Sequence, residues 1–385
     1  SDLDSINFEF YGKKLHGQNN DMTRDQLVIE LLSKNIGQMI GRQYIENYFD
    51  QKIKPMVREM IQNIRYQMYL SIKNSKWMSV GTRNNAMLKL KKIRTKIGYP
   101  DVWKNYDDLI NDLNNKNICT FSSFSLINGI KMYNYKRNVI HLSDSYQDPE
   151  KWSMCPQDVN AYYDPQRNEM VFPAGILVPP FFDDKPDTKQ SLGKNYGGIG
   201  TVIGHEITHG YDDQGRKYDQ DGNLSNQWDP MDVEKYNAFA KKMIEQYDRY
   251  MVDGNHVNGK LTLGENIADL GGVVLAFRAL CKKLSESDQD QDQDQDQDQY
   301  QEFVEQQKKE FFMSYANLWK NVTKPDKRLS QLLSDPHSPG KYRVWILRNV
   351  NEFYETFANT VTAQSQNPDQ FNAMYLRPGD RIEIW

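Results

Sequence analysis

The chain has 385 residues, and its 38% hydrophobic and 12% aromatic content is enough for the core of one large or two medium domains. The formal net charge is only −4, and lysine and arginine are spread through helical patterns. This distribution excludes a basic surface for nucleic acid or for an anionic membrane. A small molecule or a peptide is the partner that the composition favours.

Cysteine and apolar content restrict the class of protein further. Cys119, Cys155 and Cys281 have no C-x-x-C or finger-like spacing, so we expect buried thiols rather than a disulfide framework or a cysteine zinc site. Residues 1–10 lack the regions of a signal peptide, and no stretch approaches the roughly 18 apolar residues of a membrane span. The chain begins with Ser1, so we expect a processed product or an excerpt of a longer protein, with an upstream signal or anchor as an alternative.

The N-terminal part has a helical pattern. Apolar residues recur at spacings of three and four over about 23–73, which predicts two long helices with a break near Pro55. A third helix is predicted over about 82–97, ending at Gly98-Tyr99-Pro100. Residues 101–150 are polar and irregular, and they support few predictions. We therefore treat 1–150 as a helical region.

A predicted hairpin precedes a mainly helical C-terminal half. The β-prone runs Val159–Tyr163 and Glu169–Phe172 flank the turn-forming residues Asp164–Asn168. Further helical patterns cover about residues 194–211, 231–251, 264–284, 300–322 and 350–363. The sequence therefore predicts an α+β fold that is predominantly helical.

An Asp-Gln repeat interrupts the last third of the chain. Asp and Gln alternate six times over residues 288–299, a composition that cannot bury apolar surface. We predict a disordered, solvated insert between two helices. Its six aspartates outnumber the whole net charge, so the acidity is local.

The segment Val202–Gly210 contains the pattern H-E-x-x-H. Four-residue spacing on a helix places His205 and His209 on one face, where two neutral imidazoles can bind one Zn²⁺. Glu206, beside the first histidine, can reach a water at the metal. By composition such a pattern arises by chance in roughly a few chains per thousand. The alternative is a surface helix with two ordinary histidines.

A tetrahedral catalytic site needs a third protein ligand, and the segment Leu263–Gly272 offers one. Glu265 and Asp269 are four residues apart on a predicted helix. One of them can bind zinc while the other accepts the second N–H of a ligand histidine. Alone, this segment reads as a helix with an exposed acidic pair, and only the histidine helix favours the ligand interpretation.

These segments, with others along the chain, resemble the neprilysin and endothelin-converting-enzyme family of zinc metallopeptidases. The resemblance rests on Val159–Tyr163, Val171–Leu177, Asn195–Gly198, His205–Asp213, Glu265–Gly272 and Pro336–Pro339, with weaker similarity at Gly41–Tyr44, Trp77–Met78 and Ile97–Pro100. It spans most of the 385 residues.

The resemblance implies a role for each residue of the metal motif. It implies that His205, His209 and Glu265 hold one Zn²⁺ per chain and that Asp269 is the partner of a ligand histidine. Glu206 is implied to be the general base that takes a proton from a zinc-activated water.

The implied fold is a thermolysin-like zincin catalytic domain over residues 151–385, with a small hairpin or edge strand beside the zinc helix. Residues 1–150 would be a remnant of the cap or linker subdomain. The large helical part that covers the cleft in the family is largely absent, which affects access and substrate size. The chain ends Ile382-Glu383-Ile384-Trp385 where the family typically has Cys-x-x-Trp. We therefore expect a reducing intracellular compartment, or an extracellular one if an upstream anchor was removed.

The resemblance also implies substrate contacts. Asn160 and Ala161 would align the peptide main chain, Arg343 would bind a substrate carbonyl, and His337 would stabilise the oxyanion. Without the resemblance these residues read as a plain hairpin, a surface charge and a loop histidine. A pocket for the side chain after the scissile bond is implied at Ile176, Phe181, Val202, Leu318 and Trp319, with core packing as the alternative.

The predicted function is a zinc-dependent endopeptidase that hydrolyses peptides or small unfolded substrates. One alternative is a peptide-binding module that keeps zinc but turns over little because its cap is missing. A structural zinc protein is disfavoured because no convincing fourth protein ligand lies near these motifs.

Overall fold

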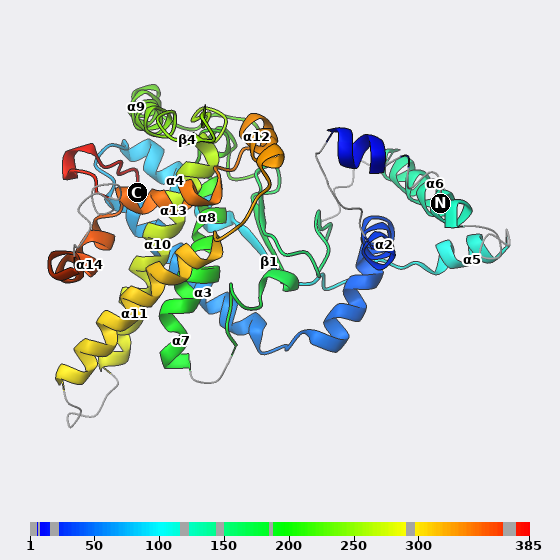
Figure 1. Cartoon of the computed structure of the whole chain (residues 1–385), viewed down its shortest axis with the longest axis horizontal. Coiled ribbons are helices and arrows are strands. Elements are labelled where there is room, and N and C mark those ends of the chain that lie inside the picture. The colour runs from blue at the N-terminus through cyan, green and yellow to red at the C-terminus, as the bar shows by residue number, and fades with distance from the viewer. Residues whose placement is uncertain are drawn as a thin grey trace. The chain divides into compact units, whose positions relative to one another are not determined.

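A computed structural model of the chain describes residues 6, 8–15, 23–115, 123–143, 150–184, 188–289, 297–364 and 375–385 (Figure 1). The chain forms two compact units. The first unit comprises Ser1–Gln51, Lys96–Asn160 and Pro173–Gly175, and the second comprises Lys52–Thr95, Ala161–Phe172 and Ile176–Trp385. The predicted boundary at residue 150 stays a prediction.

The first unit is helical. Its elements are the π-helix η1 (Phe8–Leu15), α2 (Arg24–Tyr48), α5 (Asp107–Asn115) and α6 (Ser123–Ser143). Tyr106, Leu109, Leu113 and Ile130 form a core, against which Ile36 and Met39 of α2 and Leu126 and Tyr133 of α6 pack. Thr23 begins α2 with a capping box that Gln26 completes.

Two predictions for the N-terminal part need correction. The two long helices are confirmed as α2 and α3 (Ile53–Asn74), but the break falls at residues 49–52, and Pro55 lies in the first turn of α3, where proline is tolerated. The third helix was predicted too long. α4 covers Val80–Lys92, and Arg94–Gly98 forms strand β1, in which β-branched residues pair in the sheet.

The predicted hairpin is confirmed, but its first strand begins three residues later than predicted and each strand ends one residue later. β2 (Tyr162–Asp164) pairs antiparallel with β3 (Glu169–Pro173), and Tyr163 lies opposite Met170. The three-stranded sheet has the order β1-β3-β2. In the turn, Asn168 adopts a φ of 46° and hydrogen-bonds through its side chain to the carbonyls of Lys89 and Gln220. This amide therefore joins the hairpin to α4 and to the loop after α8.

Helices dominate the second unit. They are α3, α4, α7 (Thr188–Asn195), η4 (Tyr196–Gly200), α8 (Thr201–His209), α9 (Pro230–Tyr247), α10 (Leu263–Gln289), α11 (Gln297–Leu318), α12 (Pro325–Ser334), α13 (Gly340–Val344) and α14 (Asn351–Gln364). Short 3-10 turns are η5 (Gly215–Lys217), η6 (Trp345–Asn349) and η7 (Pro378–Asp380), and a further one, η3 (Ala174–Ile176), begins in the first unit. A small hairpin joins β4 (Met251–Val252) and β5 (Asn255–His256).

The helix predicted over 194–211 is three elements, because the backbone at Gly198 leaves the helical conformation, with a φ of −88° and a ψ of −108°. Other segments of the chain approach η4 closely at its glycines. A Cβ on Gly197 would lie 2.1 Å from the Phe311 carbonyl oxygen, and one on Gly198 would lie 2.2 Å from that of Phe181. Four further helices, α5, α6, α12 and α13, were not predicted from sequence patterns. At the Asp-Gln insert, α10 extends to Gln289 and α11 begins at Gln297, so the helices include both ends of the predicted disordered stretch, and residues 290–296 lie outside the described part.

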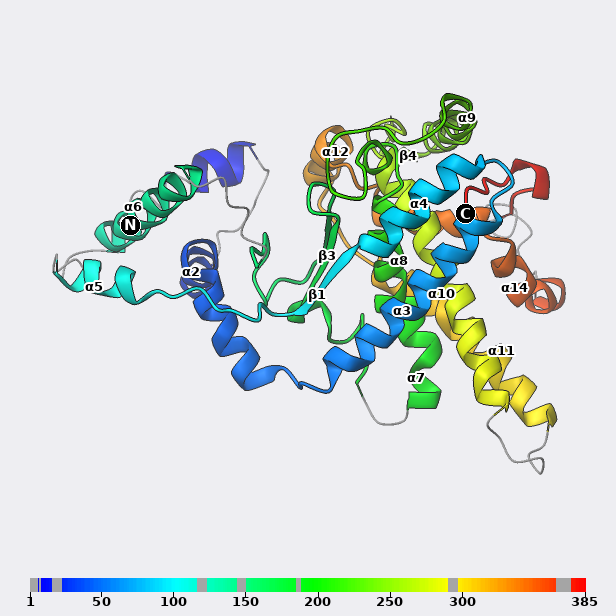
Figure 2. The same ribbon diagram turned by 180° about the vertical axis from the view of Figure 1, so that it is seen from behind.

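The centre of the second unit is helix α8, which packs against α10 and α3 (Figure 2). α8 and α10 approach closely at small residues. A Cβ on Gly272 would lie 2.5 Å from the Thr201 carbonyl oxygen, and one on Gly271 would lie 2.2 Å from Thr208 Oγ1. This backbone-to-backbone packing sets the distance between the predicted ligands of the two helices.

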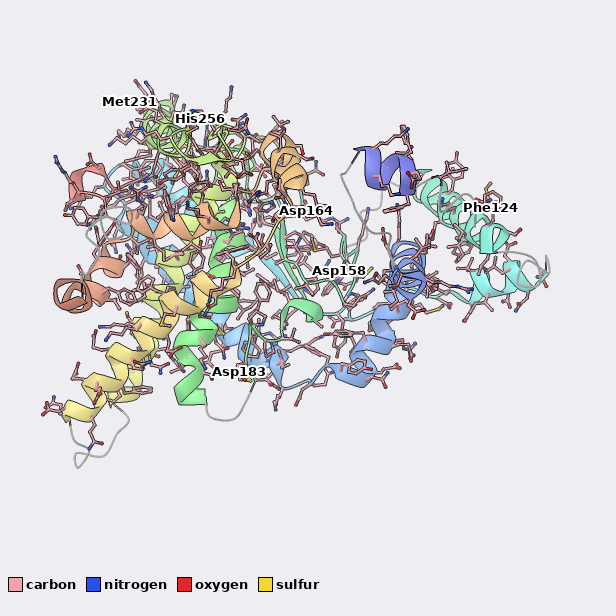
Figure 3. The ribbon with its side chains drawn as sticks, in the orientation of Figure 1. Phe124, Asp158, Asp164, Asp183, Met231 and His256 are labelled. Atoms are coloured by element: carbon pink, nitrogen blue, oxygen red, sulfur yellow. The ribbon has the colours of Figure 1, made fainter. Side chains whose placement is uncertain are left out.

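Surface features of the second unit lie away from this centre. Met231, near the start of α9, and His256, in the β4–β5 hairpin, are both exposed (Figure 3). His256 Nδ1 lies 2.7 Å from the Asp248 carbonyl oxygen, as expected for an ordinary surface histidine. Within the described residues, no helix combines the length and the apolar character needed to cross a bilayer.

The cysteines are only partly as predicted. Cys155 and Cys281 are free thiols, but both are half-buried rather than buried, and Cys119 lies outside the described residues. Burial raises the pKa of each of the two thiols to about 11, so neither has the character of a reactive nucleophile.

Candidate metal centre

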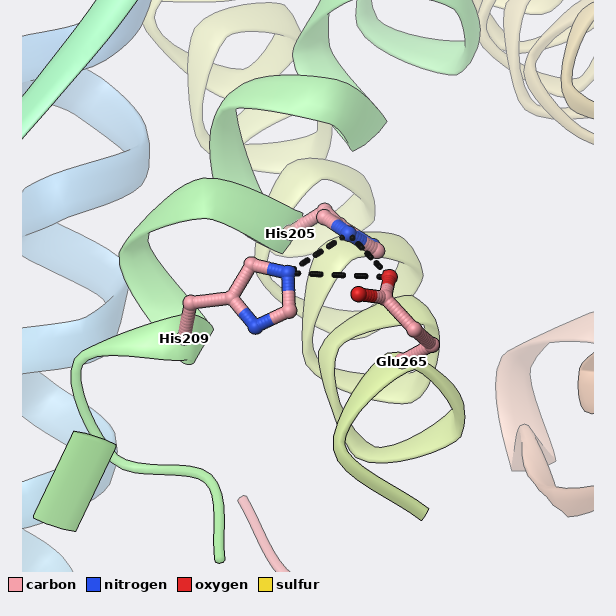
Figure 4. A group of neighbouring side chains, drawn as sticks. All are labelled: His205, His209 and Glu265. Carbon is pink, nitrogen blue, oxygen red and sulfur yellow. Dashed lines mark hydrogen bonds and ion pairs between the residues drawn. The ribbon is translucent and has the colours of Figure 1, made fainter. Parts of the chain in front are cut away.

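The side chains of His205, His209 and Glu265 converge between α8 and α10 (Figure 4). The two histidines are one helical turn apart on the face of α8 that meets α10, and Glu265 is in the first turn of α10. The two Nε2 atoms are 3.0 Å apart, and Glu265 Oε2 lies 3.1 Å from that of His205 and 3.6 Å from that of His209. The structure therefore brings the predicted ligand set together.

These distances fit one tetrahedral zinc ion. Ligand bonds of about 2.0 Å place neighbouring donor atoms about 3.3 Å apart, close to the three spacings observed. Glu265 Oε2 is buried and accepts no well-formed hydrogen bond, although ring nitrogens surround it. A buried carboxylate oxygen that makes no hydrogen bond and is surrounded by ring nitrogens fits the position of a metal ligand.

His205 is oriented by Asp269. Asp269 Oδ1 lies 2.9 Å from His205 Nδ1, so an Nδ1–H donates to the carboxylate and the Nε2 lone pair faces the centre. Asp269 also accepts hydrogen bonds from Arg343, from Nε at 2.8 Å and from Nη2 at 2.6 Å. Burial alone would raise the pKa of Asp269, but Arg343 and His205 lower it, so the carboxyl stays ionised.

His209 is oriented by Asp212, which the sequence analysis missed. Asp212 Oδ2 lies 2.7 Å from His209 Nδ1, and Oδ1 accepts hydrogen bonds from the backbone N–H of Gln214 and of Gly215. The sequence contained a local indication of this role, because a carboxylate three residues after a ligand histidine can reach its Nδ1. Each histidine therefore has its own carboxylate.

Lys89 supports this second pair from behind and was also missed. The ammonium is buried and donates to the carbonyl oxygens of Gly215, at 2.7 Å, and of Tyr218, at 2.8 Å. Burial lowers the pKa of Lys89 to about 8, against the opposing effect of Asp212. The lysine thus fixes the loop whose amide groups hold Asp212.

The titration of the three converging side chains reflects their crowding. Burial and His209 would lower the pKa of His205, but Asp269 and Glu265 raise it above its usual value. Burial would raise the pKa of Glu265, yet the two imidazoles hold it well below its usual range. Burial would lower the pKa of His209, but Asp212 and Glu265 raise it well above its usual value. The site is therefore a carboxylate facing two imidazoles that readily become cationic, an arrangement in which a metal cation competes with protons.

Glu206 is buried and follows His205, one of the predicted ligands, in α8. Burial raises the pKa of its carboxyl, and the neighbouring histidines oppose this effect. A carboxylate with a raised pKa is suited to accept a proton near neutral pH.

His337 and Arg343 approach the centre from the C-terminal part. His337 is about half exposed, with Nε2 3.2 Å from Glu265 Oε2 and Nδ1 2.9 Å from Asp335 Oδ1. The Arg343 guanidinium is buried, uses two nitrogens on Asp269 and stacks on the Trp319 ring at 3.6 Å. The structure thus gives Arg343 a bonded position behind His205, and its predicted contact with substrate stays a prediction.

The remaining predicted substrate residues are distributed as follows. Ala161 is buried just before β2, and Asn160 is exposed and belongs to the first unit. In the predicted pocket, Ile176 is buried, and Phe181, Val202, Leu318 and Trp319 are half-buried. Their roles in substrate binding stay predictions.

The sequence of the chain is similar to those of known proteins. Residues 160–372 match the model of peptidase family M13, and residues 1–100 match a second model with the same description. The chain is 36% identical over 351 residues to Neprilysin-3 of Drosophila melanogaster, covering 91% of this chain and 42% of that protein. It is 38% identical over 351 residues to an endothelin-converting enzyme homolog of Locusta migratoria, covering 91% and 45%.

Two solved structures share the fold. Zinc metalloprotease ZMP1 of Mycobacterium tuberculosis, in complex with an inhibitor, matches with a TM-score of 0.83 and 34% identity over 100% of this chain and 55% of that one. PEPO from Lactobacillus rhamnosis HN001 matches with a TM-score of 0.79 and 30% identity over 97% and 54%.

The predominantly helical α+β fold is thus one that a zinc metalloprotease adopts, as predicted. The chain belongs to peptidase family M13, which confirms the resemblance to neprilysin and endothelin-converting enzymes. It spans less than half the length of the two curated relatives.

Proposed function

We propose that this chain carries the catalytic centre of a zinc-dependent endopeptidase that cleaves peptides or small unfolded substrates. One observation supports it above all: donor atoms of two histidines and a glutamate lie within 4.8 Å of one another, directly beside a buried glutamate. The names of the relatives, a neprilysin and an endothelin-converting enzyme homolog, agree with peptide hydrolysis.

In this proposal His205, His209 and Glu265 hold one Zn²⁺. When bound, the ion supplies Lewis-acid polarisation of a carbonyl group and lowers the pKa of water. Asp269 and Asp212 keep both imidazoles in the tautomer that presents Nε2, because each accepts the Nδ1 proton.

Glu206 is the general base of the proposed reaction. Its carboxylate takes a proton from the attacking water and later gives it to the leaving amine. Burial raises its pKa, which strengthens the carboxylate as a proton acceptor and allows it to serve as an acid in the second step.

Donors and an edge strand complete the proposed site. His337 directs an N–H toward the negative charge that develops on the substrate carbonyl oxygen. Asn160 and Ala161 align the peptide main chain, Arg343 contributes a further donor, and the pocket from Ile176 to Trp319 takes the side chain after the scissile bond.

The test is digestion of a mixed peptide library, with and without a zinc chelator, by the wild-type chain and by Glu206→Gln. We expect chelator-sensitive cleavage by the wild type. Glu206→Gln removes the base but none of the three ligands, so we expect it to keep zinc and to lose turnover by several orders of magnitude. Cleavage by a clean, zinc-loaded Glu206→Gln variant would overturn the assignment of the base. Absence of any chelator-sensitive cleavage by the wild type would favour a zinc-retaining peptide-binding module.

A further inference from the structure

We propose that the hydrogen bond between Ser338 and Asn266 is a tether that positions His337 against the metal centre, which makes both residues positioning residues for the reaction. This inference rests on the proposed function and names two residues to which neither the motif nor the ligand set gives a role.

The tether is a single buried hydrogen bond between helix α10 and the segment that links α12 to α13. Ser338 Oγ donates to Asn266 Oδ1 at 2.7 Å, and Ser338 and Asn266 are 4% and 0% exposed. Asn266 is itself fixed, because its Nδ2 donates to Thr262 Oγ1 at 2.9 Å. The acceptor that receives the Ser338 hydroxyl is therefore held in one orientation inside α10.

The two tethered residues each follow a functional one. Asn266 follows Glu265 in α10, and Ser338 follows His337 in the segment 335–339, which we call the His337 loop. Two consecutive residues of the loop therefore contact two consecutive residues of α10. His337 Nε2 lies 3.2 Å from Glu265 Oε2, and Ser338 hydrogen-bonds to Asn266. Fixing Ser338 therefore fixes the backbone of the residue whose ring faces the centre.

The His337 loop has little else that could set this position. α12 ends at Ser334 before it, and on the far side Gly340 packs so closely that a Cβ there would lie 2.5 Å from the Trp319 carbonyl oxygen. Between these points the His337 ring is 46% exposed, and its contact with Asp335 stays within the loop. Apart from the contact of the His337 ring itself with Glu265, the buried Ser338 bond connects the loop to α10, the helix that carries Glu265.

Stabilisation of a developing oxyanion requires a donor within a few tenths of an ångström of its place, because its effect falls steeply with misplacement. Loss of the tether should therefore lower kcat and leave KM and zinc content nearly unchanged. A residue that serves only the overall stability would not have this selective effect.

The experiment is a double-mutant cycle on kcat with the zinc-loaded full chain. We expect His337→Ala to lower kcat on the order of 100-fold and Ser338→Ala on the order of 10-fold. In the His337→Ala background, Ser338→Ala should change kcat less than twofold, since the donor it positions is already gone. Ser338→Thr keeps the hydroxyl and should restore most of the rate, and Ser334→Ala, which removes an exposed hydroxyl at the end of α12, is the matched control.

A second readout does not depend on activity. Ser338→Ala should accelerate amide hydrogen exchange in residues 335–339 of the zinc-free and zinc-loaded chain, while Ser334→Ala should leave that segment unchanged. Wild-type kcat together with unchanged exchange in Ser338→Ala would overturn the tether and leave the proposed function intact. Equal rate losses for Ser338→Ala with and without His337 would overturn it as well. If the wild type shows no chelator-sensitive cleavage, the proposed function and the catalytic role of the tether are both rejected. The exchange data then test only whether the Ser338 hydrogen bond holds residues 335–339 in place.

Discussion

The α8–α10 helix pair and the His337 loop both face the candidate metal centre, but they reach it in different ways. The helix pair places His205, His209 and Glu265 through backbone packing at glycine and through buried carboxylates bound to each imidazole. The loop presents a half-exposed His337 that is joined to α10 by the Ser338 contact. The difference indicates that the predicted ligand set is held by a rigid frame, whereas the backbone beside the proposed oxyanion donor is held by the Ser338 contact.

The largest loss of stability and of zinc affinity is expected from a substitution where α8 and α10 meet. Gly272→Val would place a Cβ 2.5 Å from the Thr201 carbonyl oxygen and 3.0 Å from the backbone nitrogen of His205, so α8 and α10 must separate. We expect a loss of about 3 kcal/mol in the free energy of unfolding and a zinc affinity lower by at least about 100-fold. Denaturant unfolding and chelator competition measure the two quantities.

Gly81→Ala is the control for that variant. Gly81 is also helical, but a Cβ there meets nothing within 4 Å, so zinc affinity should stay at the wild-type value and stability should not fall. Wild-type zinc affinity in Gly272→Val would show that the frame tolerates separation, and the contrast between helix pair and loop would fail.

The next largest loss is expected at Lys89, which supports the loop that holds Asp212, the partner of His209. Lys89→Met keeps the length of the side chain but leaves the carbonyls of Gly215 and Tyr218 without their buried donor. We expect about 1–3 kcal/mol lower stability and about tenfold weaker zinc binding, because the loop that holds Asp212 loosens. Lys92→Met, which removes an exposed ion pair with Asp221 from the same helix, should change neither. Equal zinc affinity in Lys89→Met and Lys92→Met would confine the role of Lys89 to stability.

The smallest effect on the site is expected from Asp232, which separates stability from ligand placement. Asp232 Oδ2 accepts the Ser79 N–H at 2.7 Å and joins α9 to the start of α4. Burial would raise the pKa of Asp232, but the hydrogen bonds, chiefly from Ser79, lower it to about 2. We expect Asp232→Asn to lose about 1–2 kcal/mol at neutral pH, measured by denaturant unfolding, with unchanged zinc affinity.

The pH dependence of Asp232 follows from the sign of its shift. Its pKa in the folded state, about 2, lies below the unfolded value of about 3.9, so the contribution is present above pH 4 and disappears as the pH falls toward 2. The stability difference between wild type and Asp232→Asn should vanish over that range. A difference that persists at pH 2 would mean that the carboxylate charge is not its source.

Sequence reasoning succeeded where the signal is local and periodic. His205 and His209 are one turn apart, and the hairpin and the long helices follow from short patterns of their own residues. Glu265 needed a tertiary assumption, that α10 packs on α8, and the residues alone left Glu265 and Asp269 as alternative ligands. The structure distinguishes them, since Glu265 faces the two Nε2 atoms and Asp269 faces Nδ1 of His205.

The failures have physical causes. Strand β1 was predicted as the end of a helix because five residues cannot reveal a period, and pairing with β3 decided the outcome. Lys89 was missed because it bonds to backbone carbonyls about 130 residues away in sequence, and such acceptors leave no mark on residue identity. Asn266 and Ser338 were missed for a related reason, since a buried polar pair is recognisable only when both partners are placed together.

The most direct measurement of the central claim is zinc stoichiometry combined with X-ray absorption at the zinc edge, on the purified wild-type chain and on Glu265→Gln. The proposed ligand set predicts one zinc per chain, with nitrogen and oxygen ligands at about 2.0–2.1 Å, two of them imidazoles, and a much weaker affinity in Glu265→Gln. Sulfur ligands, a wild-type chain that binds no zinc, or full zinc retention in Glu265→Gln would contradict the assignment of His205, His209 and Glu265.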